Sequence, residues 1–167
     1  MKYQNIKDEK MKIQTESIIY PLPDDTLLER IEGNLEVKFP SEFCMFIKKN
    51  NGAIPITKYF AHKNNRYVVE RFLCLLDNPS ENPKGMYDMK VVFSQLDERI
   101  ISDEDLTGAE IVPIAALYAG DFVCIDYREN QMSPEICIWY HEDSDEFEPF
   151  TEKIANNINE FFEMLSE

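Results

Sequence analysis

The chain has 167 residues, of which 44% are hydrophobic and 12% aromatic, and its 17 Lys and Arg against 32 Asp and Glu give a formal net charge of −15. The length and apolar content correspond to one globular domain and exclude two full domains or a largely disordered chain. The acidic excess argues against direct binding to nucleic acid or anionic lipid, because that binding depends largely on Lys and Arg.

Residues 1–22 are predicted to form a polar N-terminal arm, and residues 23–167 the folded domain. The arm ends in a short apolar stretch, residues 18–20, which we interpret as an edge strand ahead of Pro21 and Pro23. This run is too short for a secretory signal or a membrane span, which need about 7–15 and about 20 apolar residues. We therefore expect a cytoplasmic protein that makes no contact with a membrane.

The four cysteines, Cys44, Cys74, Cys124 and Cys137, lie far apart, and no pair has the CxxC spacing of a metal or redox motif. Each lies among apolar residues, so we interpret them as reduced thiols of the core. In an oxidising compartment they could pair in three ways.

Two amphipathic helices are predicted between residues 24 and 52. Asp24 offers an N-cap oxygen to the first, whose apolar side chains recur at helical spacing from Leu27 to Leu35. Ser41 is the expected cap of the second helix, which ends where an Asn-Gly pair at Gly52 supplies a left-handed stop.

The period of the apolar residues changes after residue 54. Residues 59–75 are rich in β-branched and aromatic side chains and are split by polar residues 63–65, which predicts a β-hairpin. Residues 77–85 are predicted to form a surface loop, and Asp88 to cap a third helix that runs to about residue 100. We place residues 111–115 at a sheet edge or a bend, because Pro113 cannot donate a ladder hydrogen bond.

The C-terminal part is the most strongly patterned. Residues 122–127 and 136–140 are apolar runs of strand length joined by a polar stretch, and they predict a second hairpin. A final amphipathic helix is predicted to carry on one stripe Ile154, Ile158, Phe161, Phe162 and Leu165.

Four of these stretches also share a pattern with known proteins. Residues 27–55 combine an apolar helix, the step Phe39-Pro40, a helix with aromatic positions and the stop Asn51-Gly52. Residues 112–115 read Val-Pro-Ile-Ala, residues 120–126 form a Gly-Asp-(apolar run)-Asp strand, and residues 138–143 read Ile-Trp-Tyr-His-Glu-Asp before the terminal helix. In order and spacing they resemble the SUKH superfamily, the SMI/KNR-like proteins that occur as fungal cell-wall regulators and bacterial immunity proteins.

The resemblance implies a single α+β domain of the SMI/KNR-like type, with a mostly antiparallel sheet and helices packed against it. It implies no enzymatic activity, and we expect no cofactor. In bacteria it implies an antitoxin that binds and neutralises a cognate toxin protein, often a nuclease or a deaminase. The alternative is a regulatory or scaffold module without a toxin partner, in the manner of the fungal relatives.

The acidic excess is uneven along the chain. Residues 121–167 carry 13 Asp and Glu against Arg128 and Lys153, a net charge of −11, which leaves −4 for residues 1–120. A one-sided field of this kind can steer a basic partner and raise its association rate. The residues alone favour a simpler interpretation, a solvated surface that keeps the protein soluble, and only the resemblance favours a binding face.

The densest acidic cluster is residues 141–146. An EF-hand type Ca²⁺ loop would need a further Asp or Asn and then Gly where Phe147 and Glu148 stand. A general acid and base pair would need carboxylates in different environments, which a run of exposed acids does not provide. A mobile acidic loop beside an aromatic anchor would suit a protein interface, although a strand-end loop with one core Trp remains a strong alternative. The predicted partner-binding residues are Asp126, Trp139, His141, Glu142, Asp143, Asp145 and Glu146.

The sequence predicts no catalytic and no metal-binding residues. His62 and His141 lack a Cys or His at ligand spacing, and the five glycines form no phosphate-binding loop. A catalytic Cys–His pair brought together by folding remains an alternative, although no nucleophile elbow accompanies any Ser or Cys. A third hypothesis is a carboxylate hydrolase or a metal-binding protein. Asp121 is better explained by hydrogen bonds to turn amides after Gly120 than by partner contact. The oligomeric state stays open.

Overall fold

Six antiparallel strands build the main sheet of the computed structural model, which describes residues 11–167. Each strand pairs with the next along the chain, so the sheet is a meander. The strands are β3 (Tyr59–His62), β4 (Asn65–Phe72), β5 (Ile111–Leu117), β6 (Phe122–Asp126), β7 (Glu135–Trp139) and β8 (Thr151–Ala155). A smaller sheet pairs β1 (Ile13–Gln14) with β2 (Ile54–Pro55).

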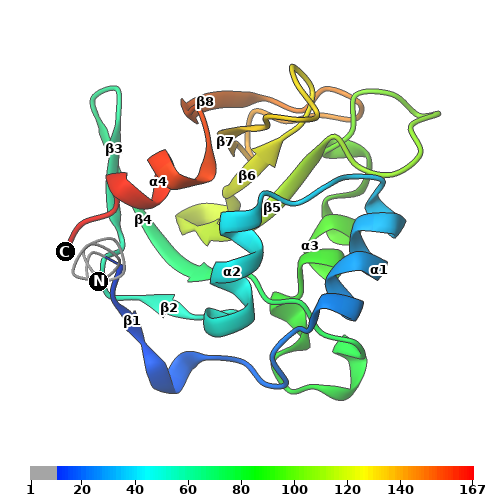
Figure 1. The fold of residues 1–167 in the computed structure, drawn as a ribbon. Helices are drawn as coiled ribbons and strands as arrows, with labels where there is room; N and C mark the ends of the chain where they lie inside the picture. Colours follow the sequence, from blue (N-terminus) through cyan, green and yellow to red (C-terminus); the bar gives the residue numbers. More distant parts are fainter. Residues whose placement is uncertain (1–10) are drawn as a thin grey trace.

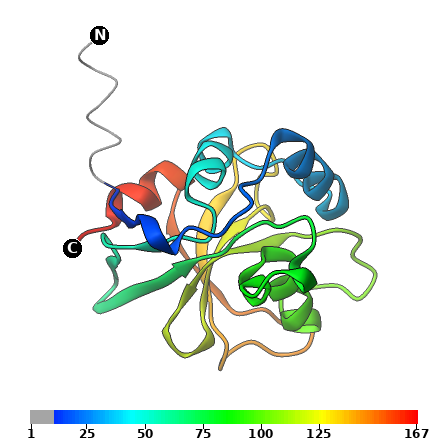
Figure 2. The ribbon, with the colours of Figure 1, turned by 90° about the horizontal axis from the view of Figure 1, so that it is seen from below.

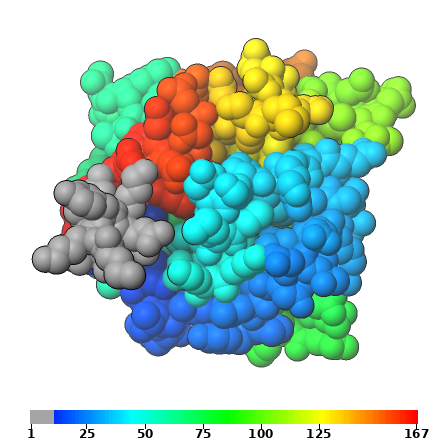
Figure 3. All heavy atoms as spheres, in the orientation of Figure 1, coloured from blue at the N-terminus to red at the C-terminus, as the bar shows by residue number. Residues whose placement is uncertain are grey.

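Helices pack against both sides of this sheet. The α-helices of the described residues are α1 (Asp25–Leu35), α2 (Ser41–Asn50), α3 (Met89–Leu96) and α4 (Ile158–Met164). Helices α1, α2 and α4 lie on one side, and α3 lies toward the other (Figures 1 and 2). The space-filling view shows α1, α2 and α4 forming much of the surface on their side (Figure 3). This arrangement confirms the predicted α+β class.

The sheet coils so strongly that its two edge strands approach each other. Lys63, in the turn between β3 and β4, forms an ion pair with Glu152 of β8, the strand at the opposite edge. Tyr67 of β4 and Tyr140, just after β7, share a hydrogen bond between their hydroxyl groups at 3.0 Å. Helix α4 contacts β3, β7 and β8 and so spans the gap between the edges.

The core lies between the sheet and its helices. Trp139, Phe72 and Phe161 are the largest fully buried side chains. Three of the four cysteines are buried and Cys44 is half-buried, and all four are free thiols, as predicted. Burial raises the pKa of the Cys74 thiol to about 12 and that of the Cys124 thiol well above its ordinary value, so both stay protonated and unreactive near neutral pH.

Local signals place most helix ends correctly. The Asp24 side chain accepts a hydrogen bond from the Leu27 amide, and Asp88 caps α3 by accepting bonds from two amides. Gly52 has a φ of +66°, and a Cβ atom there would lie 2.5 Å from Ile19, so the expected left-handed stop requires glycine.

Of the two alternatives predicted for residues 111–115, a sheet edge or a bend, the edge is wrong. Strand β5 lies between β4 and β6 rather than at an edge. Pro113 is tolerated because the pairing of β5 with β6 shifts register between Pro113 and Ala115, and such a bulge removes the need for a ladder N–H.

Other boundaries also differ from the predictions. Ile154 belongs to strand β8, which was not expected, and the final helix begins only at Ile158, capped by Asn157. Helix α3 ends at Leu96 and continues as the 3-10 turn η4 (Asp97–Arg99). Ser41 is the first residue of α2 and makes no capping hydrogen bond.

The predicted arm is described only from residue 11, and residues 1–10 lie outside the described residues. The strand in this region is β1, not the expected residues 18–20. Ile19 is instead buried against Cys74 and Leu76 in a small second core.

Candidate protein-interaction surface

The acidic loop of residues 141–149 connects β7 to β8 and is held in place by Arg99 of η4. The Arg99 guanidinium donates hydrogen bonds to the carbonyl oxygens of His141 and, at 3.2 Å, Ser144. It also lies 5.4 Å from the centre of the Trp139 ring, whose Nε1 donates to the Arg99 carbonyl oxygen at 2.9 Å. Arg99 therefore anchors the loop beside a buried tryptophan, whereas the sequence suggested a loop without such contacts.

The loop is also folded on itself. Ser144 is buried, its amide donates to the Tyr140 carbonyl oxygen at 3.1 Å, and its Oγ accepts from the Phe150 amide at 2.9 Å. Asp145 and Glu148 exchange two backbone hydrogen bonds, and the Phe147 amide donates to the Glu98 carbonyl oxygen at 2.7 Å. These bonds fix the backbone, so the side chains that it carries are presented from a rigid base.

Acidic side chains of this loop are exposed to solvent, and Glu146 lies beside Glu98, an acidic residue from a distant part of the sequence. The pKa of Glu98 is raised, chiefly by a hydrogen bond and the like charge of Glu146, and to a smaller extent by Asp97 and Glu104. We define the acidic surface as Asp97, Glu98, Glu104, Glu142, Asp143, Asp145 and Glu146. Sequence analysis missed the first three, because their proximity to the loop depends on η4 packing under it.

Two residues predicted to bind a partner are absent from this surface. Trp139 is 0% exposed and belongs to the core, so it is not an exposed anchor. Asp126 is 7% exposed, and its carboxylate accepts bonds from Arg128 Nε at 3.0 Å and Nη2 at 2.8 Å. It also lies at the far end of β6, because Phe122, not Asp126, pairs with Trp139. In this structure both side chains make intramolecular contacts, and a role of either in partner binding stays a prediction.

His141 does lie at the surface, next to the acidic residues. Its amide donates to Asp121 Oδ1 at 2.8 Å, and its Nδ1 lies 3.3 Å from Arg99 Nη1. Asp121 therefore has the structural role favoured from the sequence, although the amide that it binds comes from the neighbouring strand end. Burial raises the pKa of the Asp121 carboxyl despite this hydrogen bond.

Aromatic side chains flank the acidic surface. Tyr118 is 77% exposed and Phe150 47% exposed, while Tyr140 is half-buried with its ring centre 5.7 Å from that of Phe150. Tyr118 precedes Gly120 in the β5–β6 turn, and a Cβ atom at Gly120 would lie 3.4 Å from the His141 ring, so the turn packs beside the loop (Figure 2). We call Tyr118, Tyr140 and Phe150 the aromatic flank.

The exposed acidic and aromatic side chains of this surface have the composition of a protein interface. Within residues 11–167, no three His, Cys, Asp or Glu side chains are placed to hold a metal ion. Exposed aromatic residues beside charged ones are typical of protein interfaces, in which a few aromatic side chains contribute most of the affinity and charges set the association rate. In the same described part of the chain, no helix is long and apolar enough to cross a membrane.

Comparison with known proteins agrees with this architecture. No curated protein matches the chain. The protein-family model SUKH_6, described as SMI1-KNR4 cell-wall, matches residues 25–162, from the first helix to the last. The match spans well over half of the sequence and includes every strand of the main sheet. The chain therefore belongs to the SUKH family of SMI1-KNR4 proteins.

Proposed function

We propose that this protein is a non-enzymatic, cytoplasmic immunity protein of bacteria, which binds and neutralises a cognate toxin protein with a basic domain such as a nuclease or deaminase. Family membership supports a role of this kind. The observation that carries the proposal is the acidic surface, because its carboxylates are exposed, four of them on a loop anchored by Arg99, with the aromatic flank beside them.

Electrostatics suits the acidic surface to a basic partner. The like charges of Glu98 and Glu146 lie close enough to raise the pKa of Glu98, and a cationic partner would relieve this repulsion. A basic toxin domain would be attracted over several ångströms before contact, which raises its association rate most at low salt. Once this protein covered the cationic face of such a partner, that face could no longer bind the partner's substrate.

A regulatory or scaffold module is the alternative function, and the cell-wall description of the family model favours it. Such a module would bind several partners with moderate affinity and would not protect cells from a toxin. The two functions differ in whether one partner is toxic by itself, which gives a direct experiment.

The experiment captures partners with the tagged protein from lysate of its own cells and then expresses each partner alone in a sensitive host. We expect one stoichiometric partner with a basic domain that arrests growth, and we expect coexpression of this chain to restore growth. Several partners without toxicity would instead support the regulatory module. A toxic partner that is not neutralised by this chain would refute the immunity function.

A further inference from the structure

One edge of the main sheet has backbone groups that no residue from 11 to 167 pairs with. Tyr59, the first residue of edge strand β3, exchanges two backbone hydrogen bonds with Ser166, at 3.0 and 2.9 Å. Residues of a strand alternate between its two sides, so Ala61 directs its N–H and C=O to the same outer side as Tyr59. Ala61 is exposed and faces Arg66 of β4 on its inner side, and within residues 11–167 no strand pairs with it on its outer side. The outer side of β3 is therefore paired with Ser166 at Tyr59 and is open to a further strand at Ala61.

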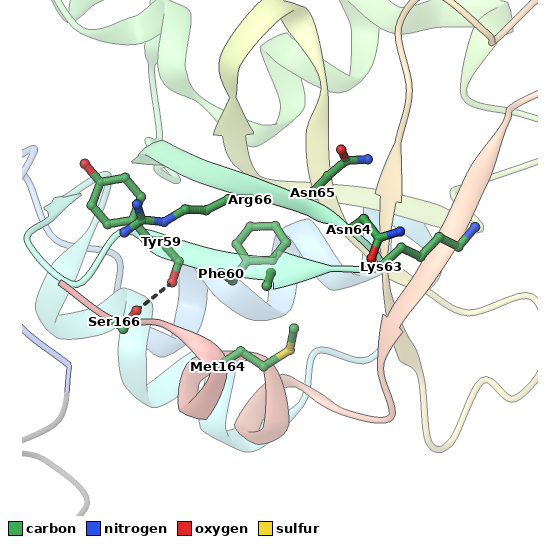
Figure 4. A pocket seen from close by; sticks show the side chains of 9 residues that line it. Tyr59, Phe60, Lys63, Asn64, Asn65, Arg66, Met164 and Ser166 are labelled. Carbon is green, nitrogen blue, oxygen red and sulfur yellow. Dashed lines mark hydrogen bonds between the residues drawn. The ribbon is translucent and has the colours of Figure 1, made fainter.

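An open hollow of about 400 Å³ lies beside this edge. The β3–β4 hairpin forms one wall, and Met164, the last residue of α4, and Ser166 form the other (Figure 4). The hollow gives an added segment space to continue past Ser166 along the outer side of β3.

This edge is basic, although the chain as a whole is strongly acidic. The Arg66 guanidinium carbon lies 3.9 Å from the centre of the Tyr59 ring, and Lys58 Nζ lies 5.5 Å from the same ring. Among the described residues neither cation has a carboxylate partner, whereas Lys63 is paired with Glu152. Stacking on Tyr59 covers one face of the guanidinium and leaves its N–H edge available for a carboxylate.

The register of the hairpin brings the cations and the free backbone together. Arg66 is paired directly with Ala61, whose small side chain lets the guanidinium reach across β3 to Tyr59 (Figure 4). A strand added beside Ala61 would place every second side chain on that same face of the sheet. Acidic side chains at those positions would meet Arg66 and Lys58.

We propose that the outer edge of β3 binds an extended acidic segment of a partner protein by β-strand addition. Backbone hydrogen bonds to Ala61 provide the pairing, and charge-assisted bonds to Arg66 and Lys58 select for carboxylates. A second copy of this chain is disfavoured as the occupant, because pairing of two β3 edges would bring like cations together. This site is separate from the acidic surface and does not depend on the immunity function.

The test measures binding of a fluorescent seven-residue peptide of alternating Glu and Val to the full chain by anisotropy. Two control peptides replace Glu with Lys or carry N-methyl groups on the backbone edge that would pair with Ala61. We expect saturable binding of the Glu peptide only. Absence of binding, or equal binding of the Lys or N-methylated peptide, would overturn the proposal.

Variants locate the site. Arg66→Gln is expected to lower the affinity for the Glu peptide about tenfold, because a charge-assisted bond is lost. The control Lys84→Gln removes an exposed cation elsewhere and should leave the affinity within about twofold of that of the unmodified protein. Ala61→Pro, which an edge strand tolerates, is expected to abolish binding while the circular dichroism spectrum is retained. Equal effects of Arg66→Gln and Lys84→Gln would overturn the proposal. The proposal would also be overturned if no peptide binds and the chain instead forms a dimer that Ala61→Pro dissociates.

The acidic surface provides the last control. The triple variant Glu142→Gln, Asp143→Asn, Glu146→Gln should keep peptide affinity within about twofold. Loss of peptide binding in this variant would overturn the assignment of the peptide site to β3. If the variant still binds the peptide but no longer binds the toxin partner, the two ligands use different surfaces.

Discussion

The acidic surface and the β3 edge carry opposite charges and are built in different ways. The acidic surface has seven carboxylates, and four of them lie on a loop whose carbonyl oxygens at His141 and Ser144 accept hydrogen bonds from the Arg99 guanidinium. The β3 edge has two cations that rest on an aromatic ring and have no carboxylate partner within residues 11–167. The net charge of −15 has the sign of the acidic surface and gives no indication of the basic β3 edge. Local structure, not total charge, therefore decides which ligand each surface favours.

The β3–β4 hairpin and the strands that carry the acidic loop meet where the sheet closes on itself. The Lys63–Glu152 ion pair and the hydrogen bond between Tyr67 and Tyr140 join the hairpin to the strands beside the acidic loop. Substitutions in the core, in the acidic loop and in the hairpin should therefore have different effects on stability and on binding.

The largest effect is expected at Trp139, which was predicted to bind a partner and is fully buried in the structure. Trp139→Ala should lower the free energy of unfolding by about 3–5 kcal/mol, because a fully buried ring is lost. Tyr118→Ala, at an exposed position, should change stability by no more than about 0.5 kcal/mol. Urea unfolding measures both. A stable Trp139→Ala protein that has lost only partner binding would contradict the core position of Trp139.

A smaller loss is expected from Arg99→Gln. It removes charged hydrogen bonds to two carbonyl oxygens and should lower the free energy of unfolding by about 2–3 kcal/mol. Amides of residues 142–147 should also exchange faster with deuterium. Arg30→Gln is the control, because its ion pair with Asp77 is exposed and contributes less than about 1 kcal/mol. Unchanged exchange in Arg99→Gln would show that other contacts hold the loop.

The smallest effects concern pH and have opposite signs at the two surfaces. The raised pKa of Glu98 means that the folded state holds this proton more tightly, so its contribution to stability grows as pH falls through that pKa. The pKa of Glu152 is lowered, chiefly by Lys63, so its contribution is present above the ordinary value of 4.5 and is lost as pH falls through the lowered pKa.

Two variants separate these contributions. Glu146→Gln should remove the Glu98 response and slightly raise stability near neutral pH, whereas Lys63→Gln should lower stability near neutral pH and have little effect in acid. Urea midpoints measured from about pH 7 to about pH 3.5 check both changes. Shifts of the same sign in both variants would contradict the assigned partners.

The sequence predicted elements whose signals are local. Caps at Asp24 and Asp88 and the stop at Gly52 act within one helical turn, and the alternating strands of both hairpins pair across short connections. Pro113 misled the prediction for β5, because the bulge that accommodates it depends on the partner strand. Ile154 fits the stripe of the last helix equally well, and only pairing with β7 makes it a strand residue.

The candidate site was predictable only in part. The exposed acids from Glu142 to Glu146 follow from their density in the sequence, whereas the anchor Arg99 is more than 40 residues away and has no sequence signal of its role. Trp139 and Tyr140 are adjacent, and strand alternation alone does not tell which one faces the core. The stacking of Arg66 on Tyr59 required the register of the hairpin.

The most direct test of the central claim is the association rate of the captured toxin partner with matched charge variants. The triple variant Glu142→Gln, Asp143→Asn, Glu146→Gln removes three charges from the acidic surface, and Glu29→Gln, Glu42→Gln, Glu81→Gln removes three exposed charges elsewhere. At low salt the first variant should associate about tenfold more slowly than the unmodified protein, and the second within about twofold of it. Equal rates for the two variants would contradict a role of the acidic surface in partner binding.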